Sequence, residues 1–221
     1  MRIGTLGNGM MAEALAGGWV RAGHDVMIGG RSLQRATETA ERVGAVAGSL
    51  EDAASYGDVV LLAVPADVAT DVARLVPDGA TLIDCTNAVD HRDFTLAQDA
   101  VAEAISEAAG PGVTVVKAFN LAADTVWRNP PAGLGVPICG DSPDPTAPAP
   151  DGVEVVAGLV RDLGCVPVAA GGLARARLLE ATAVLAIGIW MGGGDVRGMF
   201  PPLADAFGTV LPGEPQAPGR K

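Results

Sequence analysis

The sequence has few of the residues on which many enzymes build acid–base or metal chemistry. Among 221 residues there are two histidines, three cysteines and one tyrosine, and aromatic residues make up 4%. Because only His24 and His91 could supply imidazoles, and Cys85, Cys139 and Cys165 lie far apart, no metal site is expected. We expect the cysteines to be small buried residues in a reducing cytoplasm. His24, just before a predicted strand, is expected to be structural.

Basic residues are also scarce, with 15 Lys and Arg against 26 Asp and Glu and a formal net charge of -11. This balance argues against nucleic acid or an anionic membrane as a partner. Hydrophobic residues reach 49%, yet the uncharged stretch Ala181–Gly194 is shorter than the roughly 18 residues that span a bilayer. Since a strand is predicted directly after Met1, no signal peptide is expected, and we expect a cytoplasmic protein.

What the first half does contain is an alternation of strand-like and helix-like segments. This alternation predicts an α/β fold, a Rossmann-type doubly wound parallel sheet with right-handed crossovers. Strands are expected at Arg2–Leu6, Asp25–Ile28, Asp58–Val64, Thr81–Cys85 and Val113–Ala118, and helices at Met10–Ala22, Leu33–Val43, Ala66–Leu75 and Leu96–Ala109.

The second half predicts a smaller C-terminal α/β extension. Its elements are expected to be strands at Gly135–Cys139 and Val166–Ala169, helices at Val153–Leu163 and Leu173–Met191, and a proline-rich loop over Asp141–Gly152. We expect a nucleotide-binding domain over residues 1–134, an acceptor and dimerisation domain over 135–210, and a disordered tail over 211–221. The last helix is apolar almost all round and must be buried, in the core or by a partner chain. We favour a homodimer, in which small residues such as Gly188 and Gly192–Gly194 let two helices approach.

The segment Gly7-Asn8-Gly9-Met10-Met11-Ala12 has the form GxGxxA and lies between a predicted strand and a predicted helix. Gly7 permits a tight turn, Gly9 lets the backbone approach a pyrophosphate, and Ala12 allows the helix to pack close to the sheet. The free N–H groups at the helix N-terminus favour phosphate. The loop predicts dinucleotide binding; the alternative is a Rossmann-like fold that has lost its ligand.

The end of the second strand indicates which dinucleotide is bound. NAD sites usually carry Asp or Glu there, whereas this chain has Gly29-Gly30-Arg31-Ser32, with Arg35 one turn later. Guanidinium groups and a hydroxyl suit a 2′-phosphate, so NADP(H) is the expected cofactor. The alternative is a solvated helix start with Ser32 as its N-cap.

Residues that follow the later strands are expected to line the ligand crevice. Val64 and Pro65 are expected beside the riboses, and Asn87 could bond a ribose or carboxamide, unless it serves only a turn. Lys117 and Asn120 are expected to face the cleft. Lys117 could steady a negatively charged acceptor or protonate a product; alternatively, it holds a backbone carbonyl or a surface carboxylate.

No residue is assigned firmly to catalysis, because direct hydride transfer between two rings needs little acid–base help. His91 and Lys117 are weak candidates. Glu180, inside the apolar last helix, is a candidate buried carboxylate that needs a partner, such as Arg175, Arg177 or a donor at the cleft.

Over roughly residues 1–192, these motifs resemble the coenzyme F420-dependent NADP reductases. They are also similar to the cytosolic NADPH domain of six-transmembrane metalloreductases, whose membrane domain is absent here. The resemblance is carried by GNGMMAEALA, GGRS, LLAVP, DCTNA, VVKAFN, PICGD and LARARLLE. It implies hydride transfer between NADPH and the deazaflavin F420. It also places Asn8, Gly9, Met10 and Met11 at the pyrophosphate, Gly30, Arg31 and Arg35 at the 2′-phosphate, Val64 and Pro65 at the adenosine, and Asn120 near the nicotinamide.

Three functions therefore remain open, each with its own structural expectation. An F420:NADP oxidoreductase predicts a basic strip beside the nicotinamide, for which Arg128, Arg175 and Arg177 are candidates. An NADPH-dependent reductase of an imine, carbonyl or flavin predicts a proton donor and a closed apolar pocket. The candidates are His91, Lys117 and Tyr56 for the donor and Trp127, Trp190, Met191 and Met199 for the pocket. A non-catalytic NADP-binding regulator predicts nucleotide binding alone.

Overall fold

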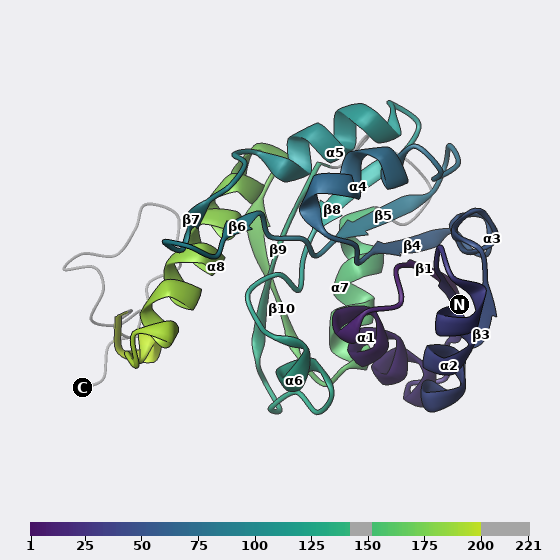
Figure 1. The fold of residues 1–221 in the computed structure, drawn as a ribbon, viewed down its shortest axis with the longest axis horizontal. Coiled ribbons are helices and arrows are strands. Elements are labelled where there is room, and N and C mark those ends of the chain that lie inside the picture. Colours follow the sequence, from purple (N-terminus) through teal and green to yellow (C-terminus); the bar gives the residue numbers. More distant parts are fainter. Residues whose placement is uncertain (142–151, 200–221) are drawn as a thin grey trace, which may run out of the picture.

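An eight-stranded sheet runs through the computed structural model, which describes residues 1–141 and 152–199 (Figure 1). The strand order is β3-β2-β1-β4-β5-β8-β9-β10, and neighbouring strands are parallel except β8 and β9. The strands are β1 Arg2–Leu6, β2 Asp25–Gly29, β3 Val46–Gly48, β4 Val59–Leu62, β5 Thr81–Asp84, β8 Thr114–Lys117, β9 Gly135–Gly140 and β10 Val166–Gly171. The predicted doubly wound α/β fold is confirmed.

Helices cover both faces of the sheet, and each face has its own hydrophobic core. One core holds apolar residues of α1, α2, α6 and α7. The other holds those of α3, α4, α5 and the first turns of α8. The helices are α1 Met10–Arg21, α2 Leu33–Val43, α3 Leu50–Ala54, α4 Ala66–Ala73, α5 Val101–Ala109, α6 Asp124–Trp127, α7 Gly152–Asp162 and α8 Ala176–Met191, with 3-10 turns at Leu173–Arg175 and Val196–Met199.

The predicted C-terminal extension continues the same sheet. β9 pairs with β8, and β10 then pairs with β9, so the sheet crosses the boundary predicted at residue 134. Most of the predicted proline-rich loop, residues 142–151, lies outside the described residues. So do residues 200–210 of the predicted second domain and the predicted tail over 211–221.

Two predicted helix starts are wrong. The helix predicted from Leu96 begins at Val101, because Leu96 belongs to β7 (Thr95–Leu96), which forms a hairpin with β6 (Val89–Asp90). The helix predicted from Leu173 begins with a separate 3-10 turn and becomes α-helical at Ala176. The pair β3 and α3 was not predicted, although Ser49 and Asp52 form a capping box there.

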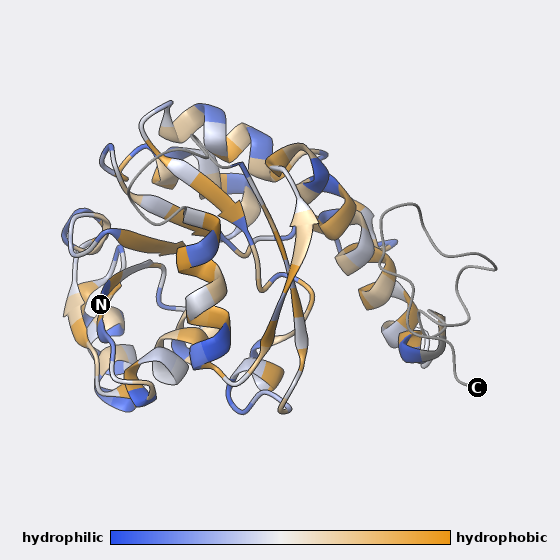
Figure 2. Cartoon of the chain, turned by 180° about the vertical axis from the view of Figure 1, so that it is seen from behind, coloured by the Kyte–Doolittle hydropathy of each residue, from blue (hydrophilic) through white to orange (hydrophobic). Residues whose placement is uncertain are grey.

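The helix α8 is only partly buried within one chain. It packs against α5 and the β6–β7 hairpin, and a Cβ on Gly188 would lie 3.1 Å from Phe94 of the same chain. Farther along it projects from the body of the molecule (Figures 1 and 2). Leu178, Leu185 and Met191 are 51%, 54% and 68% exposed. In the described ranges no helix has both the length and the apolar character needed to cross a bilayer.

Candidate functional site

The glycine loop between β1 and α1 has the geometry of a phosphate-binding turn. Gly7 has a φ of 120°, and a Cβ there would lie 2.2 Å from the carbonyl oxygen of Ala63, so only glycine fits. Gly9 is the N-cap of α1 and supplies no side-chain cap, while a Cβ on it would meet nothing within 4 Å. The first N–H groups of α1 therefore have no side-chain cap and lie at the positive end of the helix dipole.

Eight of the thirteen predicted nucleotide residues line one cavity of about 370 Å³ beside this loop. They come from the ends of β1, β2 and β4: Gly7, Asn8, Gly9, Gly30, Arg31, Arg35, Val64 and Pro65. Met10 and Met11 are the first two residues of α1 and directly follow the loop. The structure thus brings together, in space, the glycine turn and two arginines with no carboxylate between Gly29 and Ser32.

Two local contacts determine the backbone and side-chain positions near Arg31 and Arg35 in this cavity. The Oγ of Ser32 accepts a hydrogen bond from the Arg35 backbone N–H over 3.4 Å, so Ser32 is the N-cap of α2. A Cβ on Gly30 would lie 2.8 Å from the amide nitrogen of Asn8, so glycine at this position leaves room for the Asn8 side chain. The cavity also includes Asp71 of α4.

A second cavity, of about 400 Å³, shares the lining residue Pro65 with the first. It is lined by residues after β4 and β5 and from the β6–β7 hairpin: Pro65, Ala66, Asp67, Asn87, Ala88, Val89, His91, Ala97 and Gln98. His91 is exposed and lines this cavity.

Asn87 and Asn120 form an amide pair across the ends of β5 and β8. The Nδ2 of Asn87 donates to the backbone carbonyl of Asn120 over 2.7 Å, and the Nδ2 of Asn120 donates to Oδ1 of Asn87 over 3.0 Å. Both residues line a third cavity, of about 190 Å³, against α8. Its α8 wall is apolar and consists of Ala183, Ile187 and Trp190.

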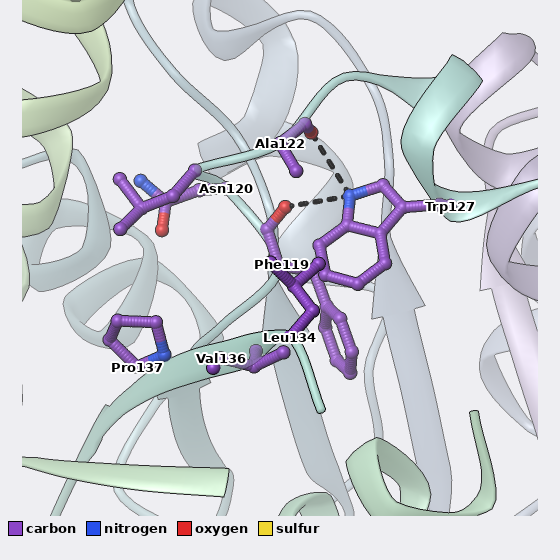
Figure 3. Close-up of a pocket in the computed structure, with 9 residues that line it drawn as sticks. Phe119, Asn120, Ala122, Trp127, Leu134, Val136 and Pro137 are labelled. Atoms are coloured by element: carbon purple, nitrogen blue, oxygen red, sulfur yellow. Dashed lines mark hydrogen bonds between the residues drawn. The ribbon is translucent and has the colours of Figure 1, made fainter. Parts of the chain in front are cut away.

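A strained turn sets the position of Asn120. Phe119 has a φ of 64°, rare for a bulky residue, and its buried ring contacts Trp19 and Trp127 edge-on. The indole N–H of Trp127 donates to the carbonyls of Phe119 and Ala122 (Figure 3). The sequence contains no local signal for this turn, because aromatic residues from other elements hold it.

Lys117 was predicted to face the cleft, and this prediction is wrong. Its side chain is fully buried, and Nζ donates to Asp84 Oδ2 over 2.9 Å, Glu180 Oε1 over 3.0 Å and the Thr86 carbonyl over 2.6 Å. Burial acts to lower the pKa of Lys117, but the carboxylates of Asp84 and Glu180 outweigh it and hold this pKa above its usual value. Lys117 is therefore a fixed buried cation instead of a proton donor to the crevice.

Glu180 is buried, as predicted, but its partner is not Arg175 or Arg177. Its carboxylate accepts from Lys117 and from the backbone N–H groups of Val101 and Ala102, at 3.1 and 3.0 Å. It thereby caps α5, whose N-cap Ala100 has no capping side chain. Asp84 was not predicted as a partner; it is the last residue of β5, and a fully buried carboxylate there requires a cation.

The predicted basic strip does not form. Arg128 pairs with Glu13 of α1, Arg177 pairs with Glu103 of α5, and Arg175 donates to the Ala170 carbonyl. Because α1 and α5 cover opposite faces of the sheet, these guanidinium groups are not gathered beside the amide pair.

The four residues predicted to form a closed apolar pocket are not brought together in the described part of one chain either. Trp127 belongs to the core, and Met191 and Met199 are 68% and 46% exposed. Trp190 alone of the four lines the cavity against α8.

The remaining candidates have structural positions. Tyr56 lies under the guanidinium of Arg2, at the amino end of the sheet and away from the crevice. His24 bonds Asp162 over 2.9 Å, which confirms its structural role. Cys85, Cys139 and Cys165 are free and buried, as predicted. Burial raises the pKa of the Cys85 thiol to about 12, so this thiol is not reactive. In the ranges 1–141 and 152–199 no group of three His, Cys, Asp or Glu side chains is arranged to hold a metal ion.

The chain was then compared with known proteins. Residues 2–88 match the family described as "NADP oxidoreductase coenzyme F420-dependent". No match was found among the curated proteins. A solved structure of a hypothetical protein, SMa0349 from Sinorhizobium meliloti, is 30% identical with a TM-score of 0.66, covering 80% of this chain and 86% of that one.

Two further solved structures share the fold at lower identity. The first, from Arthrobacter sp. FB24, carries a name that suggests an F420-dependent NADP reductase. It is 22% identical with a TM-score of 0.74, covering 87% of this chain and 95% of that one. The second is an imine reductase from Aspergillus terreus, 14% identical with a TM-score of 0.65, covering 87% and 63%. At these identities the likeness concerns the fold.

Proposed function

The chain belongs to the family of coenzyme F420-dependent NADP oxidoreductases, and we propose that its own reaction is hydride transfer between NADP(H) and the deazaflavin F420. Its activity as an NADP-dependent oxidoreductase follows from the family. The identity of the second substrate is the part that is proposed.

The residues at the glycine loop fit NADP(H). The open N-terminus of α1 at Gly9 suits a pyrophosphate, because free backbone N–H groups and the helix dipole both favour an anion. Arg31 and Arg35 line the same cavity and suit a 2′-phosphate, since each guanidinium can donate two charge-assisted hydrogen bonds. The absence of a carboxylate between Gly29 and Ser32 removes the usual acceptor for the ribose 2′-hydroxyl of NAD.

When bound, the reduced nicotinamide supplies the hydride. The chain's contribution is to hold the two rings together and to keep water out. The cavity by Pro65 and the cavity against α8 share Asn87 as a lining residue, which favours two ring systems meeting at this amide. The apolar side chains of Ala183 and Ile187 suit the face of a flat acceptor.

The observation that carries the proposal, in a chain of this family, is a row of three cavities. The nucleotide cavity shares Pro65 with the second cavity, and the second cavity shares Asn87 with the apolar cavity against α8. The test is NADPH oxidation at 340 nm by the purified protein, with and without oxidised F420. We expect oxidation that depends on F420 and on the enzyme. Tight NADPH binding without F420-dependent oxidation, under any buffer condition that keeps the protein folded, would contradict the proposal.

His91 supports a second candidate, the reduction of an imine or carbonyl by NADPH. Such a reaction needs a proton donor, and His91 lies in the cavity that also contains Pro65 and Asn87. The same assay, run with a cyclic imine, a ketone or a flavin in place of F420, distinguishes the two. If His91 donates the proton, His91→Gln should lower imine turnover and leave F420 turnover unchanged. Nucleotide binding without oxidation of any of these acceptors would indicate a binding protein.

We also propose that α8 pairs with α8 of a second copy of this chain. Leu178 and Leu185 lie two turns apart on one side of the helix and are about half exposed. Light scattering on the full chain should give a dimer. Leu185→Glu should give a monomer, whereas Leu33→Glu, at an exposed leucine on α2, should not. A wild-type monomer at micromolar concentration would contradict this pairing.

A further inference from the structure

One buried oxygen at the site has no hydrogen-bond donor. Asn120 is 4% exposed, and its Oδ1 and the Oγ1 of Thr5 are the buried side-chain polar atoms without a partner in the described part of the chain. A buried acceptor with no donor is costly, so such an atom in a folded protein needs an explanation. A ligand that brings a donor is one explanation.

The hydrogen bonds between Asn87 and Asn120 show that the unpaired atom is the oxygen of the Asn120 side chain and not its nitrogen. The Nδ2 of Asn120 already donates to Oδ1 of Asn87, and the Asn120 backbone carbonyl accepts from Nδ2 of Asn87. If the Asn120 side-chain amide were flipped, its oxygen would face Oδ1 of Asn87, and two acceptors would meet. The hydrogen bonds therefore show that the unpaired atom of this amide is the oxygen. The ligand group that meets this edge must therefore be a donor.

The surroundings indicate what kind of donor. Figure 3 shows the amide oxygen of Asn120 turned toward the side where Pro137 lies, and these two residues line a separate narrow cavity of about 50 Å³. Asn120 also lines the cavity against α8, together with Ala183, Ile187 and Trp190. Between apolar walls, a flat ring that carries an N–H on its edge satisfies both the walls and the oxygen.

We propose that Oδ1 of Asn120 accepts a hydrogen bond from an amide-type N–H on a ring bound beside the amide pair. This inference rests on the proposed function, under which two rings carry such a group: the carboxamide of nicotinamide and the lactam N–H of the deazaflavin pyrimidine ring. Asn120 would then determine specificity at the ring edge, independently of the arginines that select the phosphate.

The first test uses nucleotide binding and needs no turnover. Dissociation constants are measured by calorimetry for NADP⁺ and for its 3-acetylpyridine analogue, which lacks the N–H. If the carboxamide is the donor, the wild type should bind NADP⁺ about 5- to 10-fold more tightly than the analogue. Asn120→Leu should remove this preference, whereas Asn120→Asp should keep it. Both variants lose the bond to Asn87, and only the leucine variant loses the acceptor.

The second test applies the same logic to the acceptor. Quenching of ligand fluorescence measures binding of 5-deazariboflavin and of its N3-methyl derivative to the complex of the protein with NADP⁺. If the lactam is the donor, the wild type and Asn120→Asp should prefer the unmethylated ring about 5- to 10-fold, and Asn120→Leu should not.

The two tests identify the source of the donor and separate the two proposals. A preference in one test, lost only in the leucine variant, supports the inference and names the ring. Equal binding within both pairs by the wild type would overturn it. A preference for NADP⁺ in a protein that does not oxidise NADPH with F420 would leave this inference standing while the proposed function fails.

Discussion

Lys117 Nζ donates a hydrogen bond to Glu180 Oε1 over 3.0 Å, and both side chains are buried. This ion pair ties α8 to the sheet. The carboxylate of Glu180 also accepts the first two N–H groups of α5, and Lys117 also bonds Asp84 of β5. Lys117 therefore links β8 to β5 and α8 directly, and to α5 through Glu180. Asp84 and Lys117 each lie three residues before a member of the amide pair, Asn87 and Asn120.

Replacing Lys117 by methionine should lower the free energy of unfolding by about 3–5 kcal/mol, because two carboxylates would remain buried without a cation. Urea denaturation followed by circular dichroism measures this. The matched control is Arg161→Met, which breaks an exposed pair with Glu154 and should cost under about 1 kcal/mol. Equal losses of unfolding free energy in the two variants would show that the buried ion pair stabilises the fold no more than an exposed one.

The carboxylate of Glu13 should stabilise the fold only above acid pH. Hydrogen bonds from Arg42 and Arg128, at 2.7 and 2.8 Å, hold the pKa of Glu13 below its ordinary value. A lowered folded-state pKa means that the stabilisation is present above the unfolded pKa and is lost as the pH falls through the folded one.

Glu13→Gln should therefore cost about 1 kcal/mol of unfolding free energy at pH 7, and this cost should be smaller at pH 3. Urea midpoints at the two pH values measure the difference. Glu154→Gln, at a more exposed carboxylate, should change little at either pH. A cost for Glu13→Gln that grows as the pH falls would contradict the assigned direction.

Two glycines of the loop should respond differently to alanine. Gly7→Ala should destabilise the fold by at least about 1–3 kcal/mol, because φ is 120° and the new Cβ would lie 2.2 Å from the Ala63 carbonyl. Gly9→Ala meets nothing within 4 Å, so its unfolding free energy should stay within about 0.5 kcal/mol.

The Gly9 variant should nevertheless bind NADPH at least about tenfold more weakly, since its methyl group would occupy the space a pyrophosphate needs. Thermal unfolding and calorimetric titration of the same samples separate the two effects. Unchanged NADPH affinity in Gly9→Ala would mean that the phosphates do not approach the backbone here.

The sequence was most informative where the relevant signals are local. The glycine loop follows a strand and opens a helix within a few residues, and the arginines follow the next strand, so the rules for one βαβ unit place them together. The structure brings Gly7, Gly9, Arg31 and Arg35 to one cavity accordingly.

The sequence was least informative where distant segments meet. Lys117 had been assigned to the cleft because its strand ends there, but Asp84 and Glu180 approach from other elements and bury it. The start of α5 was misplaced for a similar reason, since Glu180 caps it from far along the chain. The left-handed turn at Phe119 depends on Trp19 and Trp127, and no local pattern predicts it.

The choice between NADPH and NADH should depend on Arg31 and Arg35. Arg31→Ala should raise the KM for NADPH by about 10- to 100-fold and leave the KM for NADH nearly unchanged, because charge-assisted hydrogen bonds to the 2′-phosphate are lost and NADH has no such group. Arg35→Ala should act in the same direction, and the double variant should approach equal use of the two nucleotides.

The control for this experiment is Arg161→Ala, which removes an exposed arginine on α7, away from the cavity. Steady-state rates with each nucleotide, measured at two salt concentrations, distinguish a specific contact from a general change in charge. A loss confined to long-range attraction should fade at high salt, whereas the loss of a direct contact should persist. If Arg31→Ala and Arg35→Ala both raised the KM values for NADPH and NADH equally, these side chains would contact a part common to both nucleotides, and the selection of NADPH would need another residue.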